Sequence, residues 1–190
     1  MEKKWLEKSV LLFVLVVLIR LGIFARKFQY KDGDIIMNKF WKNVIMFIIA
    51  FSVYISLEVI WDTTSHYSMG IISGTIFIFG NWLNNKFSWK MDLLLQCGII
   101  TVFTTILEAI VGNIDYYFWH LNIWDYSNLP LSYFNSKVNV FFIMIWLFLS
   151  LVVILVADAI EYYWFHEGEQ PEYWIFGKKV WQMPKRKCHE

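Results

Sequence analysis

The sequence has few of the residues on which disulfide-rich, metal-binding and soluble domains depend. It holds two cysteines, Cys97 and Cys188, among 190 residues, and two distant cysteines make neither a disulfide framework nor a zinc motif. Charged residues form 17% of the chain, whereas soluble domains carry about 25%. No Gly-rich phosphate-binding loop occurs, so we expect no ATPase activity in this chain. The net charge of +1 does not by itself bear on nucleic-acid binding; we expect no nucleic-acid partner.

Apolar and aromatic residues are correspondingly abundant. Hydrophobic residues form 58% of the chain and aromatic residues 20%, and they gather in long runs. A helix needs about 20 mostly apolar residues to cross the hydrocarbon core, and in lipid the backbone must satisfy its own hydrogen bonds. The sequence therefore predicts an all-α integral membrane protein, a single membrane domain over residues 1–190 with about five transmembrane helices. The predicted helices cover residues 9–25, 43–61, 68–83, 93–112 and 138–160.

Two segments outside these runs have a different character. Residues 113–137 are rich in Tyr, Trp and Phe, a composition typical of the membrane interface. We predict an interfacial or re-entrant cap there, before the last helix. Residues 165–190 form a basic tail with five lysines and arginines.

The distribution of lysine and arginine predicts the orientation. With five spans, residues 26–43, 84–92 and the tail share one side of the membrane and hold five, two and five basic residues. The other side holds four. The positive-inside rule then places the C-terminus of this multi-pass membrane protein in the cytoplasm. A cleaved signal peptide over residues 1–25 is disfavoured because the stretch has no small-x-small cleavage site.

Two carboxylates inside the predicted helices are the most conspicuous residues. Glu58 and Glu108 lie near the same predicted end of their helices. Ionisable groups within membrane helices are costly and usually face protein or water. One interpretation is a shared polar site for a cation, a proton or a substrate headgroup. The alternative is a pair of interfacial carboxylates that accept hydrogen bonds from helix or cap donors.

Small residues and histidines give two further expectations. Gly70 and Gly74 form a G-x-x-x-G pattern in the third run, which lets helices approach closely, either within the bundle or in a homodimer. The four histidines have no metal-ligand spacing. We therefore expect no metal and no cofactor. The histidines are His66, His120, His166 and His189.

One part of the chain resembles a known family. Residues 107–112 read Leu-Glu-Ala-Ile-Val-Gly, residues 124–130 read Trp-Asp-Tyr-Ser-Asn-Leu-Pro, and the next apolar run contains Trp146. This pattern resembles the bacterial ABC-transporter type IV family of multi-pass membrane proteins. The end of the second run, Leu57 to Ile60, matches the family's earlier glutamate-bearing helix more weakly. The resemblance covers residues 44–165 and implies a component of the bacterial plasma membrane, such as a permease.

The third run departs from that family. Residues 70–80 lack the Gly-Pro and Tyr-Gly pattern that its members often carry there. The Trp-Asp-Tyr loop nevertheless has a clear physical reading. Asp125 is placed to accept loop hydrogen bonds in an Asx-type turn, with Pro130 fixing the exit, and Trp124 and Tyr126 are suited to anchor the loop at headgroup level. We expect this loop to close over Glu58 and Glu108, as a structural cap or as a substrate lid.

Three functions follow as hypotheses. The favoured one is a permease or transporter-like component, with a homo-oligomer or another membrane subunit as partner beside membrane lipids. The second is a lipid-modifying membrane enzyme with a buried glutamate as general base; the sequence favours a non-enzyme, and we assign no catalytic residue. The third is a non-catalytic sensor, effector or assembly factor whose basic tail contacts anionic lipid or a cytoplasmic partner. The candidate binding residues are Glu58, Glu108, Trp124, Asp125, Tyr126, Asn128 and Pro130.

Overall fold

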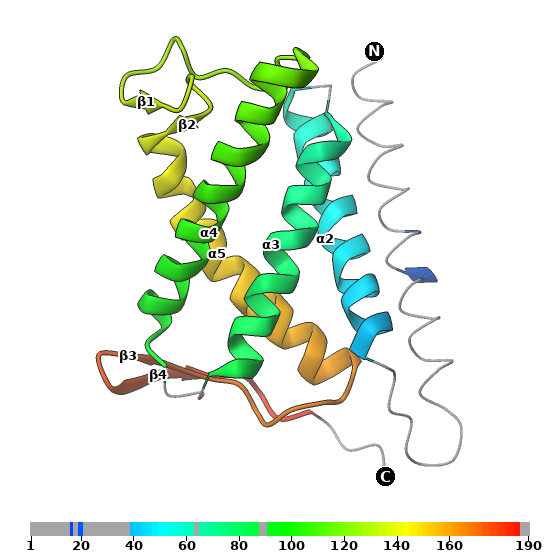
Figure 1. Ribbon diagram of the computed structural model, residues 1–190. Coiled ribbons are helices and arrows are strands. Elements are labelled where there is room, and N and C mark those ends of the chain that lie inside the picture. Colours follow the sequence, from blue (N-terminus) through cyan, green and yellow to red (C-terminus); the bar gives the residue numbers. More distant parts are fainter. Residues whose placement is uncertain (1–15, 17–18, 21–38, 63–64, 88–90, 187–190) are drawn as a thin grey trace. The chain divides into compact units, whose positions relative to one another are not determined.

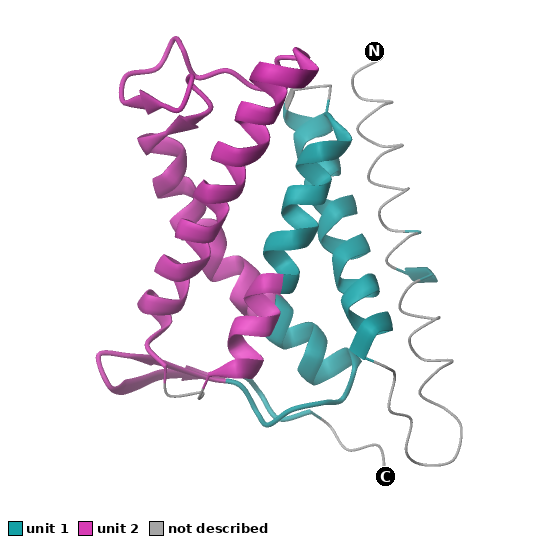
Figure 2. Cartoon of the chain, in the orientation of Figure 1, with its two compact units in different colours: residues 1–78, 157–171, 183–190 teal, residues 79–156, 172–182 magenta. Residues whose placement is uncertain are grey.

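The structure, a computed structural model, describes residues 16, 19–20, 39–62, 65–87 and 91–186. The chain forms two compact units, coloured separately in Figure 2. Unit 1 contains residues 1–78, 157–171 and 183–190, and unit 2 contains residues 79–156 and 172–182. The first predicted span, residues 9–25, lies outside the described residues except for Val16, Ile19 and Arg20, which are helical and exposed.

The described part of the chain is mostly helical, which confirms the predicted class at that level. Among the described residues, three helices are long and apolar enough to cross a membrane, so the predicted number of about five is not confirmed. The third predicted span is also a helix, but asparagines in its second half make it more polar than the others. The four long helices are α2 Lys39–Asp62, α3 Tyr67–Lys86, α4 Leu93–Ile114 and α5 Val140–Ala159 (Figure 1).

α4 continues past residue 112, where the sequence predicted its end. It runs to Ile114 and then becomes a π-helical turn, η1, over Asp115–Trp119. The His120 N–H donates to the Asp115 carbonyl at 2.6 Å, and His120 then turns into the left-handed region with φ 54°. The segment predicted to be a cap from residue 113 is therefore helical as far as Trp119. α5 likewise continues as a π-helical turn, η2, over Ile160–Trp164.

Two small antiparallel sheets add to the helices. β1 Ser132–Tyr133 pairs with β2 Val138–Asn139, and β3 Glu172–Ile175 pairs with β4 Lys178–Gln182. The β3–β4 hairpin lies within the predicted basic tail, at a run of Tyr, Trp, Ile and Val residues that favour strands. Phe176 and Gly177 form its two-residue turn, both with positive φ, as tight hairpin turns require.

The two faces of α4 are the reverse of those of a helix in a soluble protein. A soluble helix buries its apolar stripe and exposes polar residues. α4 exposes Leu94, Leu95, Val102, Ile106 and Ile110. Its buried face carries Leu93 and Ile100 together with the polar and small residues Gln96, Cys97, Thr101, Thr104, Glu108 and Gly112. An apolar outer face with a polar inner face is the arrangement of helices that are surrounded by lipid.

In unit 1, small residues on α3 lie against aromatic rings of α2. A Cβ atom on Gly70 would lie 2.6 Å from the Phe51 ring, and one on Gly74 would lie 2.5 Å from the Phe47 ring. Ser73 donates to the Ala50 carbonyl at 3.3 Å between the same helices. The G-x-x-x-G residues thus sit at a close approach of two helices of the same chain.

In unit 2, one carboxylate joins the start of α4 to the β3–β4 hairpin. Asp92 caps α4: its Oδ1 accepts from the Leu94 and Leu95 N–H groups at 2.9 and 3.4 Å. Its Oδ2 accepts from the Phe176 N–H at 2.6 Å. The hydrogen bond from Phe176 and those from Leu94 and Leu95 hold the pKa of Asp92 below its usual 3.8, against a smaller opposing effect of burial.

This lowered pKa predicts a pH-dependent contribution to stability. A carboxyl group with a lower pKa in the folded than in the unfolded state stabilises the fold above its unfolded pKa, and the effect disappears as the pH falls through the folded value. We expect wild type to melt above Asp92→Asn at pH 6 and the gap to close as the pH falls below 3.8. Thermal unfolding in detergent across this pH range measures the gap, and a gap independent of pH would contradict the assignment.

Candidate functional site at the end of α4

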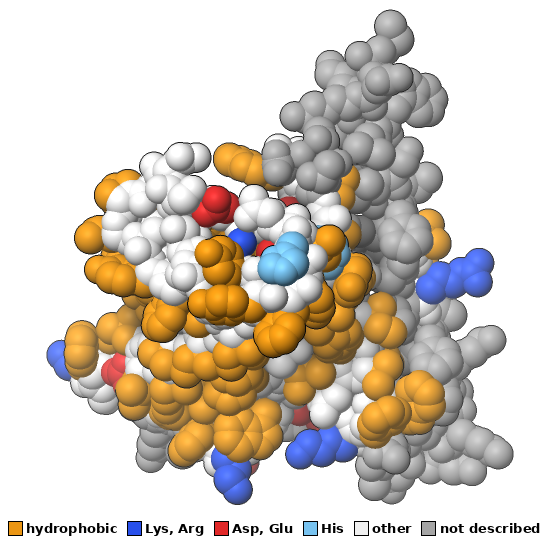
Figure 3. Space-filling model, turned by 45° about the horizontal axis from the view of Figure 1, so that its top comes forward, with side chains coloured by type: hydrophobic (Ala, Val, Ile, Leu, Met, Phe, Trp, Pro, Cys, Tyr) orange, Lys and Arg blue, Asp and Glu red, His pale blue; other side chains and the backbone are white. Residues whose placement is uncertain are grey.

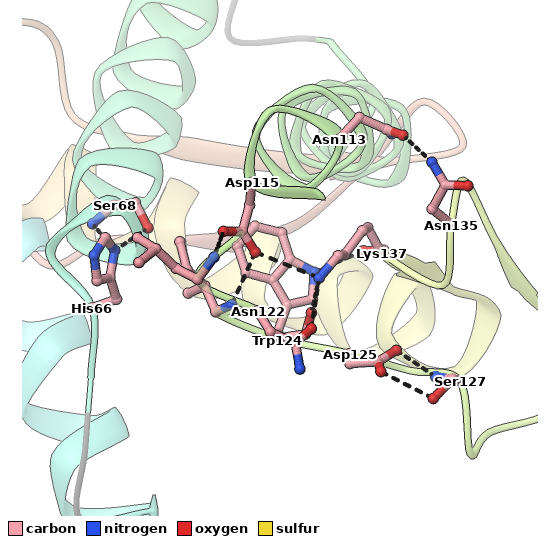
Figure 4. Close-up of polar contacts among 12 residues, drawn as sticks. His66, Ser68, Asn113, Asp115, Asn122, Trp124, Asp125, Ser127, Asn135 and Lys137 are labelled. Carbon is pink, nitrogen blue, oxygen red and sulfur yellow. Dashed lines mark hydrogen bonds and ion pairs between the residues drawn. The ribbon is translucent and has the colours of Figure 1, made fainter. Parts of the chain in front are cut away.

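A completely buried carboxylate marks the end of α4. Asp115 is 0% exposed. Its Oδ1 accepts from the Leu121 N–H at 3.0 Å, and its Oδ2 accepts from the Ile123 N–H at 2.9 Å. The ammonium group of Lys137 lies 3.5 Å from the same Oδ2 (Figure 4). The carboxylate therefore holds the chain that leaves η1 and also neutralises a buried lysine.

Lys137 is buried with Asp115 and is surrounded by acceptors. It is 2% exposed, and its Nζ donates to the Trp124 carbonyl at 2.5 Å and to Asn122 Oδ1 at 3.2 Å. With Asp115 these acceptors match the three donors of an ammonium group. The Trp124 indole N–H donates back to the Lys137 carbonyl at 2.8 Å. We call Asp115, Asn122, Trp124 and Lys137 the clasp.

The clasp packs closely against α4 because residue 112, directly beneath it, is a glycine. A Cβ atom on Gly112 would lie 2.5 Å from Cβ and 2.8 Å from Cγ of Lys137, and 3.1 Å from Cζ2 of Trp124. The glycine thus lets the aliphatic part of the lysine lie directly on the helix backbone. Gly112 is a packing position within α4, where the sequence suggested a helix end.

The loop held by the clasp, residues 120–137, contains several strained positions. Non-glycine residues with left-handed φ angles cost about 1–3 kcal/mol each, and they persist where the surrounding structure forces them. Asn135 ties the loop to α4 and η1, donating to Asn113 Oδ1 at 2.7 Å and to the Tyr117 hydroxyl at 3.2 Å. Clusters of such strain accompany ligand sites. The strained residues are His120, Asn122, Leu131, Phe134, Asn135 and Ser136.

The predicted Asx-type turn is present in this loop. Asp125 Oδ1 accepts from the Ser127 N–H at 2.9 Å and its Oδ2 accepts from the Ser127 hydroxyl at 3.0 Å. Tyr126 stacks on Phe142 of α5 with ring centroids 4.4 Å apart. Asn128 and Pro130 are exposed, and the Pro130 carbonyl accepts from Asn139 at 2.8 Å. The indole N–H of Trp124 is used within the clasp.

An open pocket of about 430 Å³ lies beside the clasp. In Figure 3, acidic, basic and histidine side chains gather in a recess on this face, with hydrophobic side chains around them. A pocket with a few convergent polar groups is the usual form of a small-molecule site. Its lining residues are Asp115, Tyr116, Tyr117, His120, Asn122 and Lys137.

Glu108 lies on the same face of α4, about 10 Å along the helix axis from Asp115. It is 1% exposed. The indole of Trp146 on α5 faces it, but neither carboxyl oxygen accepts a hydrogen bond of normal geometry from the described residues. Further along this face, Thr101 contacts Ser150 of α5 at 3.2 Å between hydroxyl oxygens. We call Thr101, Thr104, Glu108 and Asp115 the polar row.

Glu58 belongs to unit 1 and Glu108 to unit 2, so the structure describes each within its own unit. Glu58 is half-buried near the end of α2 and accepts a hydrogen bond from the Ser65 hydroxyl. A site shared by the two glutamates, and a loop that closes over both, remain predictions. Among the described residues no cluster of three or more His, Cys, Asp or Glu side chains is arranged to hold a metal ion.

Comparisons of the chain with protein-family models, curated proteins and solved structures found no match. The resemblance of residues 44–165 to the ABC-transporter type IV family therefore remains a prediction.

Proposed function

We propose that the chain is a multi-pass membrane protein, a permease-like component that conducts a small cation or a proton along the polar row of α4. The observation that carries the proposal is Glu108, a buried carboxyl group in a helix whose outer face is apolar. Carboxyl groups at such positions mark ion and proton pathways in membrane helices. Asp115 is neutralised by Lys137, which makes Glu108 the cation-attracting group of the row.

The pocket and the clasp give this pathway an entrance and a closure. Asp115 and Lys137 line the pocket, and the lysine stem with the Trp124 ring covers Gly112 between Asp115 and Glu108. Glu108 is not among the residues that line the pocket, and we place the clasp between the two. Conduction requires that this cover opens and closes, as in other gated membrane pathways.

The basic residues of unit 2 support an orientation of the protein in the membrane. The β3–β4 hairpin and the start of α4 lie at one end of unit 2 (Figure 1), and Lys178 and Lys179 belong to the hairpin. The positive-inside rule supports a cytoplasmic location for this end, and the cytoplasmic C-terminus and the bacterial plasma membrane remain predictions. A homo-oligomer or a second membrane subunit remains a prediction.

The two alternative functions have less support. A glutamate that acts as general base must pass its proton to or from a reacting group. Glu108 is 1% exposed and is not among the residues that line the pocket, so no reacting group reaches it in this conformation. The lipid-modifying enzyme and the sensor or assembly factor remain hypotheses beside the permease.

We expect Glu108 to be reached by water. Thiolates form only where water has access, so Glu108→Cys, made with Cys97→Ala and Cys188→Ala, should react with a charged methanethiosulfonate reagent. The matched control is Ile106→Cys, which lies on the exposed apolar face of the same helix. We expect position 108 to react about tenfold faster than position 106 from one side of sealed vesicles. Equal and negligible reaction at both positions from both sides would overturn the proposal.

A flux assay separates water access from conduction. The purified wild type, reconstituted in liposomes that contain a pH-sensitive dye or a sodium- or potassium-sensitive dye, should dissipate an imposed gradient of at least one of these ions. Glu108→Gln should abolish that flux, because the amide keeps the shape and removes the charge. Flux that persists in Glu108→Gln would show that the row is not the pathway.

A further inference from the structure

The β3–β4 hairpin is fixed at the level where the apolar span of α4 begins. The candidate span starts at Leu93, and the preceding residue, Asp92, accepts the Phe176 N–H at the hairpin turn. Asp92 also forms a bridge with Trp174 of β3. If α4 crosses the membrane, the turn of the hairpin therefore lies at the boundary between hydrocarbon and headgroups.

The exposed residues of the hairpin are of the types found at the boundary between hydrocarbon and headgroups. Phe176 at the turn is 84% exposed, and Val180 and Trp181 of β4 are about half exposed. Lys178 and Lys179 follow the turn and are exposed as well. Aromatic rings with neighbouring lysines are enriched at the membrane interface, where the ring meets the acyl boundary and the ammonium group meets phosphate.

The contacts of the hairpin keep this surface in place. Trp181 stacks on the buried Tyr173 with ring centroids 5.4 Å apart, and Lys179 lies 3.2 Å from both Glu172 and Gln182. Lys178 precedes this network and is the lysine nearest to the turn. The hairpin thus presents an apolar tip and a basic flank from a backbone that is attached to α4.

We propose that the β3–β4 hairpin binds the surface of the protein's own membrane leaflet, with Phe176 in the headgroup region and Lys178 against the phosphates of anionic lipids. Anionic lipids attract basic residues close to a membrane surface, with a gain of about five-fold in binding for each residue. The proposal rests only on the membrane residence of α4, so it stands or falls independently of conduction through Glu108.

Hydrogen–deuterium exchange of the full chain in lipid nanodiscs tests the proposal. We compare phosphatidylcholine alone with phosphatidylcholine containing about 30% phosphatidylglycerol. Exchange over residues 172–182 should slow by about five-fold with the anionic lipid, and Lys178→Glu should remove this slowing. The matched control is Lys86→Glu, the same charge change at the exposed end of α3, which should retain it.

The remaining outcomes decide against the proposal. Equal hydrogen exchange of the hairpin with and without anionic lipid would show that the hairpin does not bind anionic headgroups. If the slowing persists in Lys178→Glu, Lys178 does not contribute to the binding of anionic lipid, and the proposed role of the basic flank is wrong. Protection found in native membranes but absent from anionic nanodiscs would assign the surface to a protein partner.

Discussion

Replacing Lys137 by methionine is expected to destabilise the protein by about 3–5 kcal/mol. The ammonium group is the cation beside Asp115, which is 0% exposed. Methionine fills much of the space of the lysine stem and leaves the carboxylate buried without a compensating charge. Removing one partner of a buried ion pair costs far more than the pair itself contributes, because the remaining charge keeps its desolvation penalty.

Thermal unfolding in detergent or nanodiscs measures this loss. The control is the double variant Asp115→Asn with Lys137→Met, which removes the orphaned charge and leaves a side chain that still accepts from one of the two N–H groups at Leu121 and Ile123. We expect the double variant to be more stable than Lys137→Met alone. A Lys137→Met protein within about 1 kcal/mol of wild type would mean that the clasp does not hold the loop.

Local sequence patterns predicted some of this architecture correctly. The Asx turn at Asp125 depends on a residue two positions further on, so its signal is contained in the loop sequence. α2, α4 and α5 also follow from the length and hydrophobicity of their runs. Such features need no knowledge of the rest of the fold.

The clasp was missed because its members are far apart along the chain. Asp115 and Lys137 come together only when the loop between them reverses direction, and composition alone assigned both to an interfacial or re-entrant cap. One signal was present: Glu108, Gly112 and Asp115 have the spacing of a single helix face. Extending the helix beyond Gly112 would have placed Asp115 on the same face as Glu108.

The end of α4 was misjudged for a related reason. A glycine after an apolar run commonly terminates a helix, and the aromatic residues after it are typical of an interface whether or not they are helical. No proline interrupts residues 112–119, so the helix continues. Gly112 serves instead to admit Lys137, and this role depends on a tertiary contact that the sequence does not show.

The close approach at Gly112 predicts a loss of stability in Gly112→Ala. Alanine is favoured over glycine within a helix by about 1 kcal/mol. Here its Cβ would lie 2.5 Å from Lys137 Cβ, an atom next to the backbone that cannot rotate away. The loop must therefore shift, and overpacking of this kind costs about 1–3 kcal/mol. Displacement of Lys137 also weakens its contact with Asp115, so we expect a net loss of about 1–3 kcal/mol.

Gly98 supplies a matched control on the same helix. A Cβ atom there meets nothing within 4 Å, so Gly98→Ala should gain up to about 1 kcal/mol from helix propensity. The two variants make the same chemical change in α4 and should shift the unfolding temperature in opposite directions. Hydrogen exchange over residues 120–137 should accelerate in Gly112→Ala alone. Equal shifts of the same sign would mean that Lys137 moves aside without cost, and the clasp would then be a loose cover over Glu108.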